Sequence, residues 1–195
     1  MKKTIYLIIS FFMAAVPLFA QTTWTVDAAH SKIGFIVTHL VISEVEGSFD
    51  SYTGTIVASK DDFTDADINF SVDVNSIDTD NEMRDNHLKG DDFFNAQKYP
   101  KMTFKSTSFK KVSGNIYTLE GNLTIRDITK KVKFDVVYGG TVKDPYGNTK
   151  SGFKAKATIN RFDYNLTWNA LTETGSAVVS ENVDVILKLE FTKEK

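Results

Sequence analysis

Arg84 and His87 form the pairing in this chain that is best suited to chemistry. They are three residues apart in a charged segment, so on a helix their side chains would be neighbours. A guanidinium beside an imidazole suits one anionic or polar head group. Alternatively, Arg84 pairs with Asp80, Asp85 or Asp91 at the surface, where an ion pair contributes little stability. Spacing alone favours the surface pairing.

His39 offers a second candidate, because it continues an apolar strand face that contains Phe35 and Val37. The period of a strand places such a residue on the inner side of a barrel. There it is either an acid–base group near neutral pH or a histidine hydrogen-bonded within the core. Neither reading is excluded by the pattern.

Several kinds of active site have no support in the sequence. The three histidines lack metal-ligand spacing, so no metal site is predicted. The chain has no cysteine, which excludes thiol chemistry. No nucleophile elbow or glycine-rich phosphate loop is present, so we predict no catalytic residue and no cofactor.

The elements that must position these residues are mostly strands. Apolar and polar residues alternate with a period of two, as in 67–74, 131–138, 153–159 and 183–191. Clean one-face patterns are typical of antiparallel sheets. Short turns separate about eight or nine such runs, which predicts an all-β up-and-down barrel or a sandwich. A barrel of this size is either filled by side chains or holds one small ligand, and Ala155 and Ala157 leave room inside.

One segment departs from this pattern and predicts a short helix over 79–88. Thr79 and Glu82 have capping-box spacing, and Gly90 supplies a stop. A second short turn is expected from Asp91, presenting Phe93 and Phe94 before a strand begins near Lys101. The helix is therefore either a lid or a surface feature.

Residues 1–20 have the pattern of a secretory signal peptide, with two lysines, a short apolar run and cleavage after Ala20. Residues 21–195 then form one domain with no membrane anchor, exported to the periplasm. Without residues 1–20, which contain two lysines and no acidic residue, the net charge falls from −2 to −4. A mildly acidic chain lacks the clustered basic residues that nucleic-acid binding requires.

The sequence resembles the YceI-like family of exported, lipocalin-like proteins with a polyisoprenoid- or amphipathic-lipid-binding role. The central motif RD-x-HL…FF…YP carries the resemblance most specifically. It is supported in order and spacing by the stretches TWTVDAAHSKIGFIVTHL (23–40), VEGSFDSYTGTI (45–56), LEGNLTIRDITKKVKFDV (119–136) and GFKAKATINRFDYNL (152–166).

The resemblance implies an extended eight-stranded antiparallel barrel, with one short helix near 79–95 and a lumen for a long apolar tail, often as a dimer. On this reading Arg84 and His87 lie near the barrel mouth, close to the polar head. Phe35, Val37 and His39 line the lumen, and Phe93 and Phe94 pack at the entrance. Arg161 falls in a family-like motif as a ligand contact or a structural ion pair, and Trp168 is a further candidate contact.

The sequence thus predicts non-catalytic binding, transport or storage of a long-chain isoprenoid or fatty-acyl lipid. Two alternatives stay open. One is a barrel enzyme acting on a lipid-like substrate with His39 or His87 as acid or base. The other is a stress-related structural protein whose barrel is filled and has no cavity.

Overall fold

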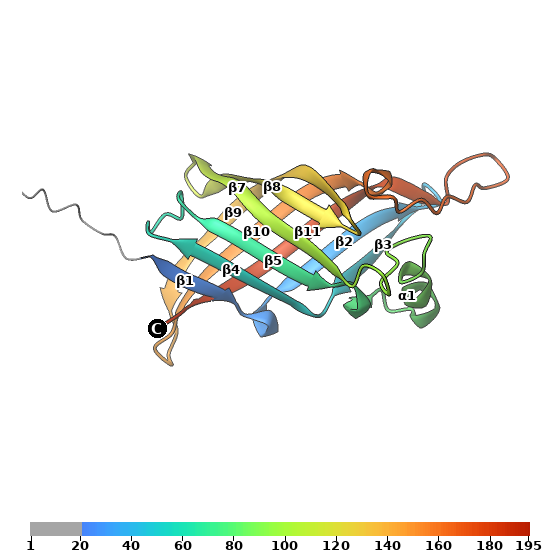
Figure 1. Cartoon of the computed structure of the whole chain (residues 1–195). Helices are drawn as coiled ribbons and strands as arrows, with labels where there is room; N and C mark the ends of the chain where they lie inside the picture. The colour runs from blue at the N-terminus through green and yellow to red at the C-terminus, as the bar shows by residue number, and fades with distance from the viewer. Residues whose placement is uncertain (1–20) are drawn as a thin grey trace, which may run out of the picture.

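The computed structural model describes residues 21–195, so the predicted signal peptide lies outside the described residues (Figure 1). The strands are β1 (Thr22–Val26), β2 (Lys32–His39), β3 (Ser43–Phe49), β4 (Tyr52–Ala58), β5 (Asp67–Asp73), β6 (Ile77–Asp78), β7 (Lys101–Ser113), β8 (Ile116–Ile125), β9 (Ile128–Lys143), β10 (Thr149–Asn160) and β11 (Val179–Lys193). The helical elements of the same residues are α1 (Glu82–Leu88) and the 3-10 turns η1 (Ala28–His30), η2 (Val74–Ser76) and η3 (Arg161–Tyr164). In this part of the chain no helix is long and apolar enough to cross a membrane.

All strand pairings are antiparallel, and the sheet runs in the order β1-β4-β5-β7-β8-β9-β10-β11-β2-β3-β6. Because β1 also pairs with β11, the strands from β1 to β11 in this order close a ring of eight. The predicted all-β, eight-stranded antiparallel barrel with one short helix is therefore confirmed. The barrel is long, since the 16 residues of β9 span about 50 Å at roughly 3.3 Å per residue.

Strand β11 links the ring of eight strands to the other three, β2, β3 and β6. Its C-terminal residues pair with β1, and its residues 183–188 pair with β2. Strands β1 and β2 therefore share one neighbour, with the turn η1 between them. This turn is a break in the barrel wall, and Glu190 of β11 lies opposite it.

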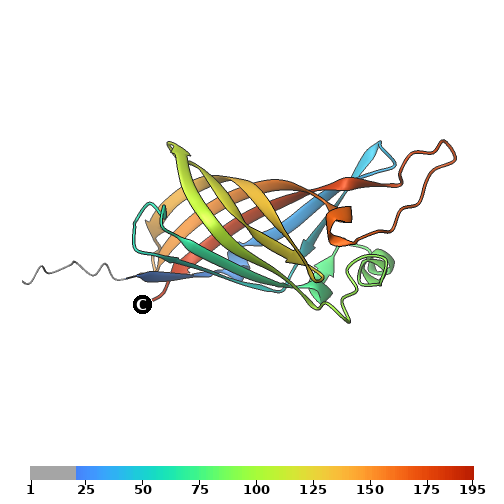
Figure 2. The ribbon, with the colours of Figure 1, turned by 45° about the horizontal axis from the view of Figure 1, so that its top comes forward.

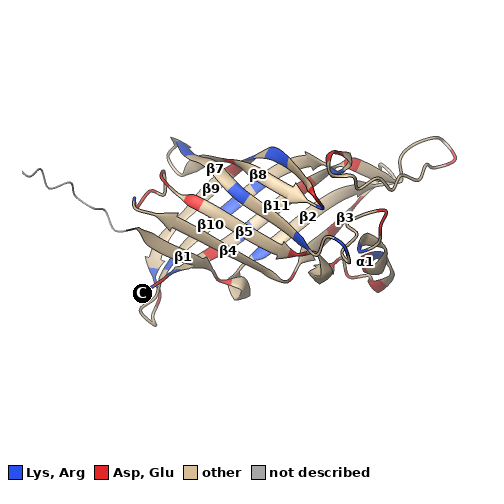
Figure 3. Cartoon of the chain, in the orientation of Figure 1, with Lys and Arg blue, Asp and Glu red and all other residues tan. Residues whose placement is uncertain are grey.

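Several non-strand segments lie at one end of the barrel. Helix α1, the loop that follows it, η3 and the loop 165–178 all lie at the same end in both views (Figures 1 and 2). We call this group of segments the lid. The C-terminus lies at the opposite end (Figure 1). Acidic and basic residues are both distributed along the strands and loops of the described chain (Figure 3).

Candidate functional site

The barrel encloses a cavity with a volume of about 210 Å³. The alternating strand residues supply its wall, as the sequence pattern predicts, for example Ile68, Phe70 and Val72 of β5 and Val183, Val185 and Leu187 of β11. The other lining residues are also mostly aliphatic or aromatic. Among the described residues that line the cavity, only Thr103, Arg161 and Tyr164 carry a nitrogen or oxygen in the side chain. This surface suits hydrocarbon far better than water.

Glycines in the wall help to keep the cavity open. Gly54 pairs across the sheet with Phe70, and a Cβ atom added to Gly54 would lie 2.3 Å from Cε1 of that ring. Gly47 has the same relation to Phe35, whose Cζ would lie 2.4 Å from an added Cβ. Each phenyl ring therefore lies back against a glycine, which leaves the middle of the lumen free.

The lid contributes its own apolar side chains to the cavity. Leu88 of α1 and Phe93 and Phe94 of the following loop line it, and Phe94 packs edge-to-face on Phe49 with ring centroids 5.8 Å apart. The segment predicted to present the two phenylalanines thus brings both of them to the cavity.

The N-terminal cap of α1 differs from the sequence prediction. Asn81 is the cap residue, because its side-chain oxygen accepts a hydrogen bond from the Arg84 amide at 3.0 Å. The predicted cap, Thr79, is wrong. The Thr79 hydroxyl instead donates to the Asp85 carboxylate at 2.6 Å, and this residue is only 4% exposed. Asn81 precedes Arg84 by three residues, the spacing at which a cap side chain accepts from the amide of the third helical residue. Asn is also among the residue types preferred at the N-cap.

Arg84 is held by the same threonine. Its Nε donates to Oγ1 of Thr79 at 2.8 Å, and a terminal nitrogen donates to the Thr79 carbonyl. Since Thr79 also contacts Asp85, the guanidinium and the carboxylate are linked through one hydroxyl. Arg84 therefore fixes α1 to the end of β6, and contact of Arg84 with a ligand stays a prediction.

His87 belongs to an aromatic cluster on the lid. Its ring lies edge-on to Phe93 and to Trp168, with centroid distances of 5.0 and 5.6 Å, and Phe93 stacks on Trp168 at 5.6 Å. The Trp168 amide also donates to the Asp92 carbonyl at 3.1 Å. Three of the predicted site residues therefore meet here and join α1 to the loop 165–178.

Arg126 strengthens the same junction and was missed by the sequence reasoning. Its Nη1 donates to the carbonyl of Phe93 at 3.2 Å and also to the carbonyl of Asn165. One guanidinium thereby joins the loop that follows α1 to the loop 165–178. In the sequence Arg126 stands in a turn dipeptide with Asp127, a context that gives no sign of these contacts.

Arg161 is a buried cation, only 3% exposed, at the start of η3. It donates to main-chain carbonyls: Nε to Ser180 at 2.9 Å, and Nη1 to Leu166 at 2.7 Å and Trp168 at 2.6 Å. Burial lowers the pKa of Arg161, and the negative charge of Glu181 opposes that effect. None of the ion pairs among residues 21–195 includes Arg161, so the alternative of a structural ion pair, which the sequence left open beside a ligand contact, does not form in this part of the chain.

The chain is similar to known proteins in sequence and in fold. The model of the YceI-like domain matches residues 24–191. The chain belongs to the YceI-like family. A UPF0312 protein of Pectobacterium atrosepticum is 35% identical over 198 residues, which cover 100% of both chains.

Solved structures show the same YceI-like fold. BcnA of Burkholderia cenocepacia superposes with a TM-score of 0.72 at 23% identity, covering 85% of this chain and 98% of that chain. A domain of Saccharophagus degradans described as polyisoprenoid-binding gives a TM-score of 0.63 at 16% identity, covering 88% of this chain and 98% of that chain.

The predicted site residues of this YceI-like chain fall into two groups. Those that line the cavity are Phe35, Val37, Phe93, Phe94 and Arg161. Those that are not among its lining residues are Arg84, His87, Trp168 and His39. His39 ends β2, is partly buried, and accepts a hydrogen bond on its carbonyl from Ser43 Oγ at 3.2 Å. The lining group is apolar except for Arg161.

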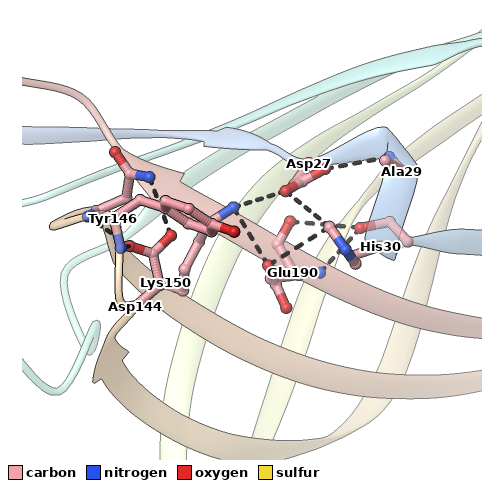
Figure 4. Close-up of polar contacts among 9 residues, drawn as sticks. Asp27, Ala29, His30, Asp144, Tyr146, Lys150 and Glu190 are labelled. Atoms are coloured by element: carbon pink, nitrogen blue, oxygen red, sulfur yellow. Dashed lines mark hydrogen bonds and ion pairs between the residues drawn. The ribbon is translucent and has the colours of Figure 1, made fainter.

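A second polar cluster lies at the break between β1 and β2 (Figure 4). Nζ of Lys150 is 2.6 Å from Oδ2 of Asp27 and 3.3 Å from Oε1 of Glu190, and Nδ1 of His30 is 3.0 Å from Asp27. The hydroxyl of Ser31 accepts from the Glu190 amide at 2.9 Å, at a residue of β11 that lies between its pairings with β1 and with β2. Asp27, His30 and Glu190 could converge on a cation, but the Lys150 ammonium already pairs with both carboxylates.

The charges of this cluster make stability depend on pH. Hydrogen bonds from Lys150 and His30 lower the pKa of Asp27 from 3.8 to about 2. The folded carboxyl therefore holds its proton less tightly than the unfolded one. Its stabilising contribution is present above about pH 4 and is lost as the pH falls towards 2.

Proposed function

We propose that this YceI-like protein binds the apolar tail of a long-chain isoprenoid or other amphipathic lipid in its lumen and carries or stores it. The observation that carries the proposal is the cavity of about 210 Å³ with an almost entirely hydrocarbon lining. Each methylene group buried there contributes about 0.8 kcal/mol to the affinity. The polyisoprenoid-binding description of the Saccharophagus degradans domain, which shares the fold, supports the same class of ligand.

In this proposal Phe35, Val37, Phe93 and Phe94 contact the tail, since all four line the cavity. Arg84, His87 and Trp168 hold the lid in place over it. The signal-peptide pattern of residues 1–20 supports a periplasmic carrier, and in an aqueous compartment a hydrocarbon tail is stabilised by cover from water.

A catalytic role has less support. Neither His39 nor His87 is among the residues that line the cavity. The filled-barrel alternative predicts no cavity, and the cavity argues against it. We therefore favour binding over both alternatives.

Native mass spectrometry of the mature protein, purified from its own host without detergent, tests this proposal. The expected spectrum contains a bound species whose mass matches a lipid recovered by organic extraction. Protein that is consistently ligand-free, and that takes up no long-chain lipid when one is offered, would overturn the proposal.

A further inference from the structure

The two buried polar side chains that line the cavity belong to one turn. Arg161 and Tyr164 are the first and last residues of η3, and both line the cavity. A 3-10 helix has three residues per turn, so side chains three residues apart lie on the same face. The two side chains therefore project from the same face of η3, at the lid end of an otherwise apolar lumen.

The Tyr164 hydroxyl is unsatisfied. Tyr164 is only 2% exposed, and its hydroxyl has no hydrogen-bond partner among residues 21–195. Buried polar groups nearly always have a partner, so an orphan hydroxyl beside a ligand cavity requires an explanation. Burial raises the pKa of Tyr164 to about 12, so the hydroxyl keeps its proton at neutral pH and is available as a donor.

The Arg161 guanidinium also has one N–H group without a hydrogen-bond partner among residues 21–195. Besides the contacts of Nε and Nη1, its Nη2 donates once, to the Val179 carbonyl at 3.3 Å. A guanidinium carries five N–H groups, and these contacts use four. Its partners are neutral carbonyls, so the buried positive charge forms no ion pair among residues 21–195, and Glu181 acts on it only through space.

We propose that Tyr164 and Arg161 bind the polar end of the ligand, and that this end carries an acceptor oxygen, with an anionic group such as a carboxylate bound more tightly than a hydroxyl. The reason for an acceptor is that the spare N–H of Arg161 can only donate and that the protonated Tyr164 hydroxyl can donate to the same oxygen. The reason for an anion is the unpaired charge of Arg161. The tail then extends from η3 along the apolar lumen. This inference rests on the proposed function, because it concerns the same cavity.

Competition binding with delipidated mature protein tests the assignment. Palmitic acid, 1-hexadecanol and hexadecane share one chain length, and each displaces a fluorescent apolar probe from the lumen. Wild-type protein is expected to bind the acid most tightly and hexadecane least. Tyr164→Phe is expected to weaken binding of the acid and the alcohol at least tenfold and to leave hexadecane unchanged. The melting temperature of the ligand-free variant should stay the same or rise, because no internal hydrogen bond is lost.

Tyr117→Phe is the matched control, since Tyr117 is equally buried but is not among the residues lining the cavity. It should leave all three affinities unchanged. Equal binding of the acid by wild type and Tyr164→Phe would overturn the inference while the proposed function stands. Loss of acid binding in Arg84→Gln or His87→Gln, with Tyr164→Phe unaffected, would place the polar end at α1 and also overturn it. If wild-type protein binds none of the three competing compounds (the acid, the alcohol and the alkane), the proposed function itself fails and the inference fails with it.

Discussion

Gly54→Ala tests whether the cavity depends on the phenyl rings that lie against glycine. The new Cβ would stand 2.3 Å from Cε1, 2.5 Å from Cζ and 2.7 Å from Cδ1 of Phe70. Ordinary carbon contacts are about 3.5–4.0 Å, so the ring must retreat by more than about 1 Å. Because Phe70 lines the cavity, its ring has to move into the lumen or the two strands must separate.

Both responses have a measurable size. Overpacking of this kind costs about 1–3 kcal/mol in the free energy of unfolding. If the displaced ring excludes about two methylene groups of the ligand, at about 0.8 kcal/mol each, the affinity falls by about 1.6 kcal/mol, or roughly 15-fold. Urea unfolding measures the first effect, and displacement of a fluorescent long-chain lipid measures the second.

Gly152→Ala is the control for this prediction. Gly152 also lies in a strand, and an added Cβ would meet no atom within 4 Å. The control should bind lipid as the wild type does. If Gly54→Ala loses stability but keeps the affinity of the control, Phe70 does not shape the ligand site and the reasoning is refuted.

Three further changes test other parts of the structure. Asp27→Asn is expected to lower the free energy of unfolding by about 1–2 kcal/mol at pH 7 and by almost nothing near pH 2, because the pKa of Asp27 is about 2 in the folded protein and partial exposure screens the pair. Urea unfolding across this pH range measures it, and a cost independent of pH would contradict it. Trp168→Ala is expected to speed lipid dissociation about tenfold, since it removes two ring contacts of about 0.5–1.5 kcal/mol each from the lid. Stopped-flow displacement measures this, and an unchanged rate would show that the lid does not control exchange. Thr79→Ala should cost about 1–3 kcal/mol, more than the roughly 1 kcal/mol of Asn81→Ala, because it leaves charged side chains without their partner. Equal losses in thermal denaturation would argue against the Thr79 network.

The barrel and its apolar lumen follow from local information. Alternation with a period of two assigns each strand residue to a face, and this places Phe35, Val37 and Val185 correctly at the cavity. The family resemblance supplies the number of strands, which alternation alone left at eight or nine. The helix also follows from local sequence, and only its cap was misassigned. Thr79 and Asn81 both suit the cap position, but the Thr79 hydroxyl instead donates to the Asp85 carboxylate six residues later.

The polar groups were harder to predict because their partners are distant in sequence. Arg126 reaches the Phe93 and Asn165 carbonyls, and no spacing rule links these residues. Lys150 and Asp27 likewise meet only because β10 and β1 flank the same strand. The unsatisfied hydroxyl of Tyr164 is a property of the packed cavity and has no signature in the chain.

The most direct test of lipid binding in the lumen is a crystal structure of the mature protein purified from its own host without delipidation. We predict continuous, elongated electron density in the lumen, in contact with Phe70 and Leu187 and ending near η3. A lumen closed by its own side chains, or one that holds only water after purification in the presence of lipid, would contradict it.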